Sequence, residues 1–240
     1  MQTFNRIFST ALFSGVIAGL ALAALQHFTV IPMILEAESY EITEEDTSNH
    51  DNSSAQDEHS TEAWAPEDGT ERTFYTATNS IIVGIGFGLL LTGCYALRGN
   101  VTWRKGILWG LAGFAAFHLA PALGLPPELP GDAAADLEQR QVWWLLTVVL
   151  TAMGLWIIAF QPKSYLKLFG IALIALPHVF GAPQPEVHQG LAPEELRTAF
   201  QLTSLSTNAV FWIALGAISA YIFNKFSRRE KSPAVNVATS

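Results

Sequence analysis

Six long apolar stretches dominate this sequence and strongly favour one kind of fold, a bundle of membrane-crossing helices. They cover residues 4–35, 77–97, 106–124, 142–160, 166–181 and 207–224. A helix needs about 20 apolar residues to cross the hydrocarbon core of a bilayer. Five stretches meet this requirement, whereas 166–181 is short and contains Pro177. We therefore predict an all-α polytopic membrane protein with about six transmembrane helices.

Charge is sorted between the segments that connect these stretches. When the segments are assigned alternately inside and outside, starting inside, the inner set holds ten of the thirteen Lys and Arg residues. The outer set holds only Arg72, Arg140 and Arg197, together with twenty of the twenty-one carboxylates. Cationic segments tend to stay in the cytoplasm. The pattern predicts both termini in the cytoplasm and an acidic outer face.

We expect a single integral membrane domain over residues 1–240. The outer segment 36–73 contains thirteen carboxylates and has almost no apolar residues in its middle, so we expect it to be largely disordered. Residues 225–240 are predicted to form a basic cytoplasmic tail. The first stretch remains apolar as far as Leu35, well beyond the core of about 7–15 residues in a cleaved export signal, so we expect a retained helix.

Several functional classes lack support in the sequence. There is no basic patch of the kind that binds nucleic acid apart from residues flanking the apolar stretches. The single cysteine, Cys94, excludes an internal disulfide. Phosphate-binding glycine loops, His-Glu-x-x-His helices and Gly-x-Ser-x-Gly turns are absent. We therefore predict no enzyme activity, no catalytic residue and no permanently bound cofactor.

A weak internal repeat divides the chain into three helical hairpins. The first, third and fifth stretches each carry a histidine in their outer half, with a proline soon afterwards: His27 and Pro32, His118 and Pro121, and His178 and Pro183. The second and sixth stretches begin with Thr78-Asn79 and Thr207-Asn208. Asn79 and Asn208 fit helix caps better than metal ligands. Glycines four apart, such as Gly15 and Gly19, predict close helix packing.

The three histidines form the strongest chemical signal. Ionisable groups in apolar spans are costly and usually face the bundle interior or a transport pathway. Imidazole is a good ligand for cobalt, nickel and zinc ions. Alternatively, each histidine donates a hydrogen bond to a carbonyl freed by the nearby proline. Because His27, His118 and His178 share position and polarity, we predict a common metal site between the helices.

Carboxylates near the outer ends of the spans are candidates to complete this site. Glu36 directly follows the first stretch, and Glu128 lies in a proline-rich segment. We predict both as oxygen ligands, whereas Glu38 and Asp132 fit ordinary solvated charges. The acidic segment 36–71 either gathers cations electrostatically or serves as a solvating tether.

Several segments resemble the CbtA-type predicted cobalt transporter subunits. The resemblance lies in residues 24–41, 105–131, 141–144, 176–183 and 206–212, and it covers nearly the whole chain outside the acidic segment. It implies a bacterial inner-membrane protein linked to cobalt uptake and cobalamin supply, together with a small single-span partner that has a histidine-rich end. That family is usually described with about five spans, so the sixth span predicted above departs from it.

The sequence thus favours transport of a divalent transition-metal ion, cobalt first and nickel or zinc as alternatives, through a histidine-lined site. A second hypothesis is a non-transporting membrane subunit that binds and stabilises a partner carrying the conduit. The glycine-spaced helices and the missing energy-coupling motif motivate it. An intramembrane metal-dependent enzyme would need a base near the histidines, and Glu128 is the candidate for that role. Metal identity, direction, energy source and oligomeric state stay open.

Overall fold

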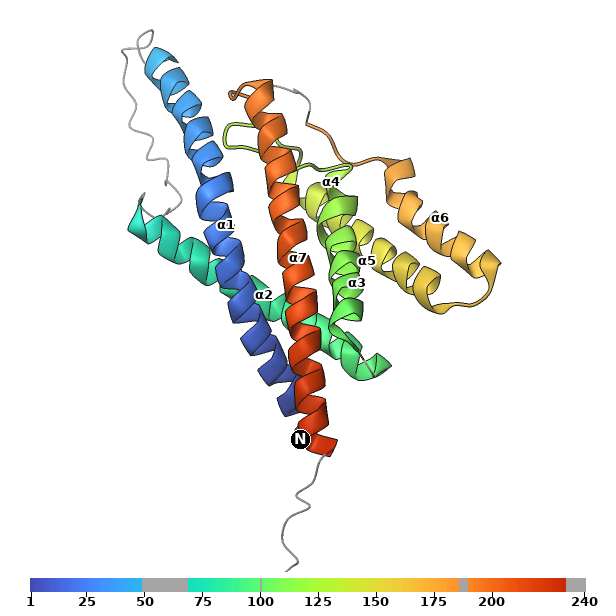
Figure 1. Cartoon of the computed structure of the whole chain (residues 1–240). Helices are drawn as coiled ribbons and strands as arrows, with labels where there is room; N and C mark the ends of the chain where they lie inside the picture. The colour runs from blue at the N-terminus through green and yellow to red at the C-terminus, as the bar shows by residue number, and fades with distance from the viewer. Residues whose placement is uncertain (49–68, 100, 186–189, 232–240) are drawn as a thin grey trace, which may run out of the picture. The chain divides into compact units, whose positions relative to one another are not determined.

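The computed structural model describes residues 1–48, 69–99, 101–185 and 190–231, and side-chain environments up to residue 41 and from 69 to 228 within these ranges. The chain is mostly helical in these ranges, which contain no strand beyond an isolated antiparallel bridge between Asp132 and Gly190. The helices are α1 Gln2–Ser48, α2 Thr70–Arg98, α3 Trp103–Phe114, the π-helix η1 Ala115–Leu119, α4 Ala120–Ala122, α5 Leu137–Phe160, α6 Ser164–Phe180 and α7 Glu194–Lys231 (Figure 1). The predicted all-α class is confirmed for the described residues.

Four helices, α1, α2, α5 and α7, are long and apolar enough to cross a membrane, and α6 is a shorter apolar helix of 17 residues. In a bilayer each backbone N–H and C=O must be bonded within the protein, and a continuous helix meets this requirement. α3, η1 and α4 follow one another without a gap and together form a continuous helical segment over residues 103–122. Each predicted apolar stretch thus coincides with a helical segment. The six-span count and the cytoplasmic termini stay predictions.

Two helices extend beyond the predicted apolar boundaries. α1 continues past Leu35 to Ser48, and α2 begins at Thr70, so both ends of the predicted acidic loop 36–73 are helical. Its middle, residues 49–68, lies outside the described residues, so its expected disorder is a prediction still. α7 likewise continues into the basic tail as far as Lys231, and residues 232–240 lie outside the described residues.

The predicted caps at Asn79 and Asn208 are wrong, because both residues lie inside helices, in α2 and α7. Those helices begin eight or more residues earlier, in polar sequence that the apolar pattern does not mark. At α5 the carboxylate of Asp136 accepts a 3.0 Å hydrogen bond from the Gln139 N–H and caps the helix start. α7 begins at Glu194, directly after Pro193, and its first turn carries the carboxylates of Glu194 and Glu195, which favour the positive end of the helix dipole.

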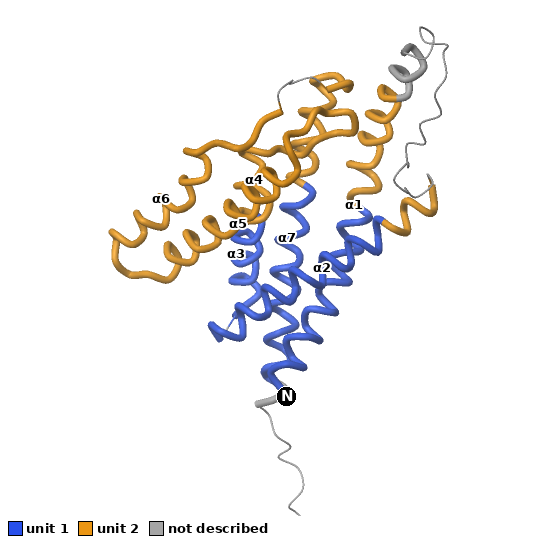
Figure 2. Tube along the Cα trace, turned by 180° about the vertical axis from the view of Figure 1, so that it is seen from behind, with its two compact units in different colours: residues 1–24, 76–114, 207–240 blue, residues 25–75, 115–206 orange. Residues whose placement is uncertain are grey.

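The chain forms two compact units. Unit 1 comprises residues 1–24, 76–114 and 207–240, and unit 2 comprises residues 25–75 and 115–206 (Figure 2). Helices α1, α2 and α7 each contribute to both units.

Glycine contacts hold the helices of unit 1 together. A Cβ on Gly84 of α2 would lie 2.5 Å from the Gly15 carbonyl oxygen of α1, and Gly19 meets Ile81 in the same way. Gly110 of α3 touches the Trp212 carbonyl of α7, and the Trp212 side chain is fully buried. The predicted role of the four-residue glycine spacing is therefore confirmed.

Unit 2 contains the α5–α6 hairpin and a small apolar core beside it. Gly154 of α5 packs directly on the Gly170 carbonyl of α6, where a Cβ would lie only 2.5 Å away. The apolar core joins α1 to the two connecting segments and to the start of α7, and consists of Val30, Ala37, Leu129, Ala192 and Phe200. This core holds the segments that carry most of the candidate site residues.

Candidate functional site

His118 lies within the π-helix η1, three residues before Pro121. Proline has no N–H to donate and its ring crowds the carbonyl four residues earlier, here that of Phe117. A π-helical turn absorbs such a disturbance, and π-turns occur frequently at functional sites. The sequence therefore places His118, which is half-buried, in a distorted part of an otherwise regular helix.

His178 occupies the last turn of α6, directly after Pro177. Its Nε2 atom is buried and makes no hydrogen bond to any described group. The ring lies edge-on to Trp143 of α5, with centroids 5.8 Å apart. Trp143 in turn donates a 3.3 Å hydrogen bond from Nε1 to the Pro177 carbonyl. Buried polar atoms in proteins are normally hydrogen-bonded, so the unbonded Nε2 atom of His178 is an exception. This nitrogen can still accept or donate one hydrogen bond, or bind a ligand when it is neutral and unprotonated.

His27 lies on an exposed face of α1. Its ring contacts Phe28 edge-on at a centroid distance of 5.1 Å, and Phe28 is itself 78% exposed. Thus His27 differs from His118 and His178 in environment, although all three occupy similar places in the sequence pattern.

His27, His118 and His178 all belong to unit 2, so their positions relative to one another can be compared within this unit. Among the residues that the structure describes, no three His, Cys, Asp or Glu side chains gather closely enough to hold a metal ion. The structure therefore does not bring His27, His118 and His178 into one preformed shell. Their role as metal ligands stays a prediction.

The two predicted oxygen ligands also lie apart in environment. Glu36 is exposed on α1, whereas Glu128 is partly buried in the segment between α4 and α5. The Glu128 Oε2 atom accepts a 2.6 Å charge-assisted hydrogen bond from Arg140 at the start of α5. An incoming cation would have to compete with this arginine for the carboxylate.

Each arginine of the predicted outer set pairs with a carboxylate from a different segment of unit 2. The pairs are Arg72 with Glu38 at 2.9 Å, Arg140 with Glu128 at 2.6 Å, and Arg197 with Asp132 at 3.1 Å. The expectation that Glu38 and Asp132 are ordinary solvated charges is therefore wrong. In the sequence, the outer segments hold only three arginines among twenty carboxylates, which indicates that each arginine forms an ion pair. The sequence does not show which carboxylate each arginine bonds.

Asp132 is the central contact of this region. Gly131 has φ of 76°, a left-handed conformation that favours glycine, and this turn points the Asp132 carboxylate back at the Leu129 N–H, 2.9 Å away. Arg197 of α7 donates to the other carboxylate oxygen from Nε at 3.1 Å. The Asp132 side chain is only 8% exposed. The contact fixes the α4–α5 connection to the start of α7.

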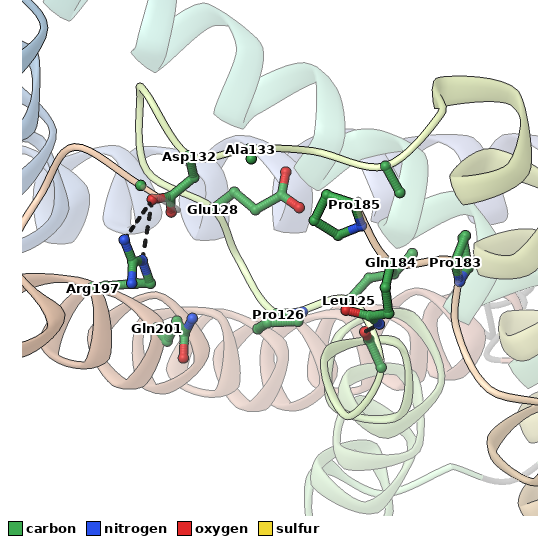
Figure 3. A pocket seen from close by; sticks show the side chains of 13 residues that line it. Leu125, Pro126, Glu128, Asp132, Ala133, Pro183, Gln184, Pro185, Arg197 and Gln201 are labelled. Carbon is green, nitrogen blue, oxygen red and sulfur yellow. Dashed lines mark hydrogen bonds and ion pairs between the residues drawn. The ribbon is translucent and has the colours of Figure 1, made fainter. Parts of the chain in front are cut away.

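A pocket of about 180 Å³ lies beside this contact (Figure 3). Its lining comes from three places, namely the α4–α5 connection, the α6–α7 connection and the first turns of α7. The polar lining residues are Glu128, Asp132, Gln184, Arg197 and Gln201. Figure 3 shows the Glu128 carboxylate between Asp132 and Pro185, while Arg197 reaches Asp132 from the side of α7. The pocket offers carboxylate and amide oxygens, which suit a hydrated cation.

Comparison with known proteins agrees with the resemblance noted in the sequence. The family model described as probable cobalt transporter subunit (CbtA) matches residues 4–224. No curated protein and no solved structure matches the chain. The match covers nearly all of the described helices, so the chain belongs to the CbtA family of probable cobalt transporter subunits.

Proposed function

We propose that this protein takes part in cobalt uptake as a multi-pass protein of the bacterial inner membrane, linked to cobalamin supply. Membership of a family of cobalt transporter subunits and the presence of four helices able to cross a membrane support this proposal. In the proposed orientation the acidic segment 36–73 faces the periplasm and the basic end of α7 faces the cytoplasm, as the charge distribution favours.

We propose a histidine-lined route for the ion, and its main support is the buried Nε2 atom of His178, which has no hydrogen-bond partner among the described residues. A neutral imidazole nitrogen is a common ligand for divalent transition metals. Leaving such an atom unpaired costs free energy, and coordination of a passing ion offsets that cost. His118, in its π-helical turn, is the second ligand proposed for the route.

The histidines are proposed to act in succession, because the structure does not gather them into one shell. Glu36 and Glu128 collect the ion on the outer side, and His27, His118 and His178 then receive it at separate points. Successive weak sites suit conduction, since an ion must bind well enough to enter and weakly enough to leave.

Glu128 can take part only when Arg140 releases it. Both side chains of this pair are nearly 30% exposed, at 28% and 29%. Exposed ion pairs contribute about 0–1 kcal/mol, which a divalent cation can outcompete. Asp132 is much more firmly held and is proposed as a structural group of the pocket.

Cobalt accumulation in cells tests the histidine route. His178→Ala and His118→Ala are each expected to lower cobalt uptake roughly tenfold or more. Removing a residue that only hydrogen-bonds a metal ligand already weakens metal binding by about tenfold, and removing a ligand itself should weaken it at least as much. Val179→Ala is the matched control, because Val179 neighbours His178 on α6 and is 80% exposed. Wild-type uptake by His178→Ala at equal protein abundance would remove His178 from the route.

The alternative function, a non-transporting subunit that stabilises a partner, is favoured by the family description as a subunit. A small single-span partner with a histidine-rich end is the proposed companion. Purified protein in sealed liposomes separates the two functions. Cobalt flux without a partner excludes the alternative, whereas flux that appears only after a partner is added supports it.

The metal itself can be identified by absorption spectroscopy. Cobalt bound by imidazole and carboxylate groups has ligand-field bands that report ligand type and geometry, and competition with nickel and zinc ranks the ions. Preference for nickel or zinc over cobalt would redirect the proposal to that ion.

A further inference from the structure

Unit 1 contains basic side chains without carboxylates of its own among the residues whose side chains the structure describes. In residues 1–24, 76–99, 101–114 and 207–228 there is no Asp or Glu. The same ranges hold six basic residues: Arg6, Arg98, Arg104, Lys105, Lys225 and Arg228. All except Arg6 are exposed. The described side chains of unit 1 therefore carry a net positive charge, most of it exposed.

Packing contacts bring these basic residues to one end of unit 1. The Arg6 guanidinium of α1 lies 4.6 Å from the ring centroid of Phe223 in α7. The ring of Tyr95, one turn before Arg98 in α2, lies 5.8 Å from the same phenylalanine. Figure 2 shows the beginning of α1 beside the end of α7.

The start of α3 joins the same end. Gly106 contacts Gly216 and Ala220 of α7, which places Arg104 and Lys105 beside the last turns of α7. Trp103 is 50% exposed, and the Arg104 guanidinium lies 5.4 Å from its ring centroid. An exposed tryptophan next to basic residues at the end of an apolar helix is typical of the membrane–water interface.

We propose that this cationic end, defined by the exposed residues Arg104, Lys105, Lys225 and Arg228, binds the phosphate headgroups of anionic phospholipids. Basic groups at a membrane surface attract anionic lipids with about 1 kcal/mol each. The basic residues lie at the ends of the apolar helices, where lipid headgroups are expected, and the exposed Trp103 favours the same depth at the membrane–water interface. The proposal concerns lipid binding alone and is independent of metal transport.

The full-length protein in vesicles of phosphatidylcholine, with or without phosphatidylglycerol, tests the proposal. We expect phosphatidylglycerol to bind preferentially, measured as lipid retained by the extracted protein in native mass spectrometry. The double variant Arg104→Gln/Lys105→Gln is expected to bind phosphatidylglycerol roughly thirtyfold more weakly, because two contributions of about 1 kcal/mol are lost. Lys225→Gln/Arg228→Gln should show a loss of similar size if the first variant does not fold.

A matched variant separates loss of charge from loss of fold. Arg104→Lys/Lys105→Arg keeps both charges and should bind phosphatidylglycerol like the wild type. Equal retention of phosphatidylglycerol and phosphatidylcholine by the wild type would overturn the proposal. A loss in Arg104→Lys/Lys105→Arg as large as that in Arg104→Gln/Lys105→Gln, or full displacement of the lipid by free inorganic phosphate, would also overturn it.

Discussion

At the scale of single residues, the contact between Asp132 and Arg197 determines how the connecting segments of unit 2 are held. The carboxylate is 8% exposed and accepts hydrogen bonds from Arg197 and from the Leu129 N–H. Gly190 lies against both charged groups, and any side chain at this position would displace them. One carboxylate thus joins the α4–α5 connection, the α6–α7 connection and α7.

Asp132→Ala is expected to lower the free energy of unfolding by about 2–4 kcal/mol, because it leaves the Leu129 N–H without its partner and removes the buried carboxylate that pairs with Arg197. Thermal unfolding in detergent measures the effect. Glu194→Gln is the control, since Glu194 also bonds Arg197 at 2.6 Å but is 78% exposed and should contribute under about 1 kcal/mol. Equal losses in the two variants would contradict this account.

At the scale of helices, glycine spacing decides which faces meet. On α2, Gly84 lies against the Gly15 backbone of α1, whereas Gly86 has nothing within 4 Å of its Cβ position. Gly84→Ala is therefore expected to cost about 1–3 kcal/mol through overpacking. Gly86→Ala should be neutral or stabilise by up to about 1 kcal/mol, because alanine favours helix. Comparison of the two unfolding midpoints checks the contrast, and similar midpoints would refute the close approach of α1 and α2.

At the scale of the whole molecule, the unsettled element is α6, whose 17 residues fall short of the roughly 20 of a typical span. If α6 crosses the membrane, its two ends should label from opposite sides. In a Cys94→Ala background, Lys163→Cys should react with a membrane-impermeant maleimide only from the cytoplasmic side. Gln184→Cys should react only from the outside. Labelling of both positions from one side would mean that α6 enters the membrane without crossing it.

Much of the fold was predictable, because a bilayer imposes strict rules on the backbone. Apolar stretches must be helical, and their number and order follow from the sequence. The predictions failed where helices run beyond the membrane-like sequence, as at the end of α1 and the start of α2. There, neighbouring segments stabilise the helix; for example, Ala37 and Phe200 belong to the same buried core.

The candidate site was less predictable. Equal position in a sequence pattern suggested equal roles for the three histidines, yet His27 is exposed whereas the Nε2 atom of His178 is buried. Position along a helix determines depth in the membrane, whereas rotation of the helix determines which neighbours a side chain meets. Rotation is set by packing contacts such as that between Gly154 and Gly170.

The sequence by itself determined that this chain is helical, that it is built for a membrane, and that it belongs with the cobalt transporter subunits. These properties depend on local composition and on short motifs. Tertiary structure alone decided that three lone arginines each bond a carboxylate of another segment, and that His178 is left with a buried free nitrogen. Such pairings join residues up to 65 positions apart, and only the packing of the helices brings them within bonding distance.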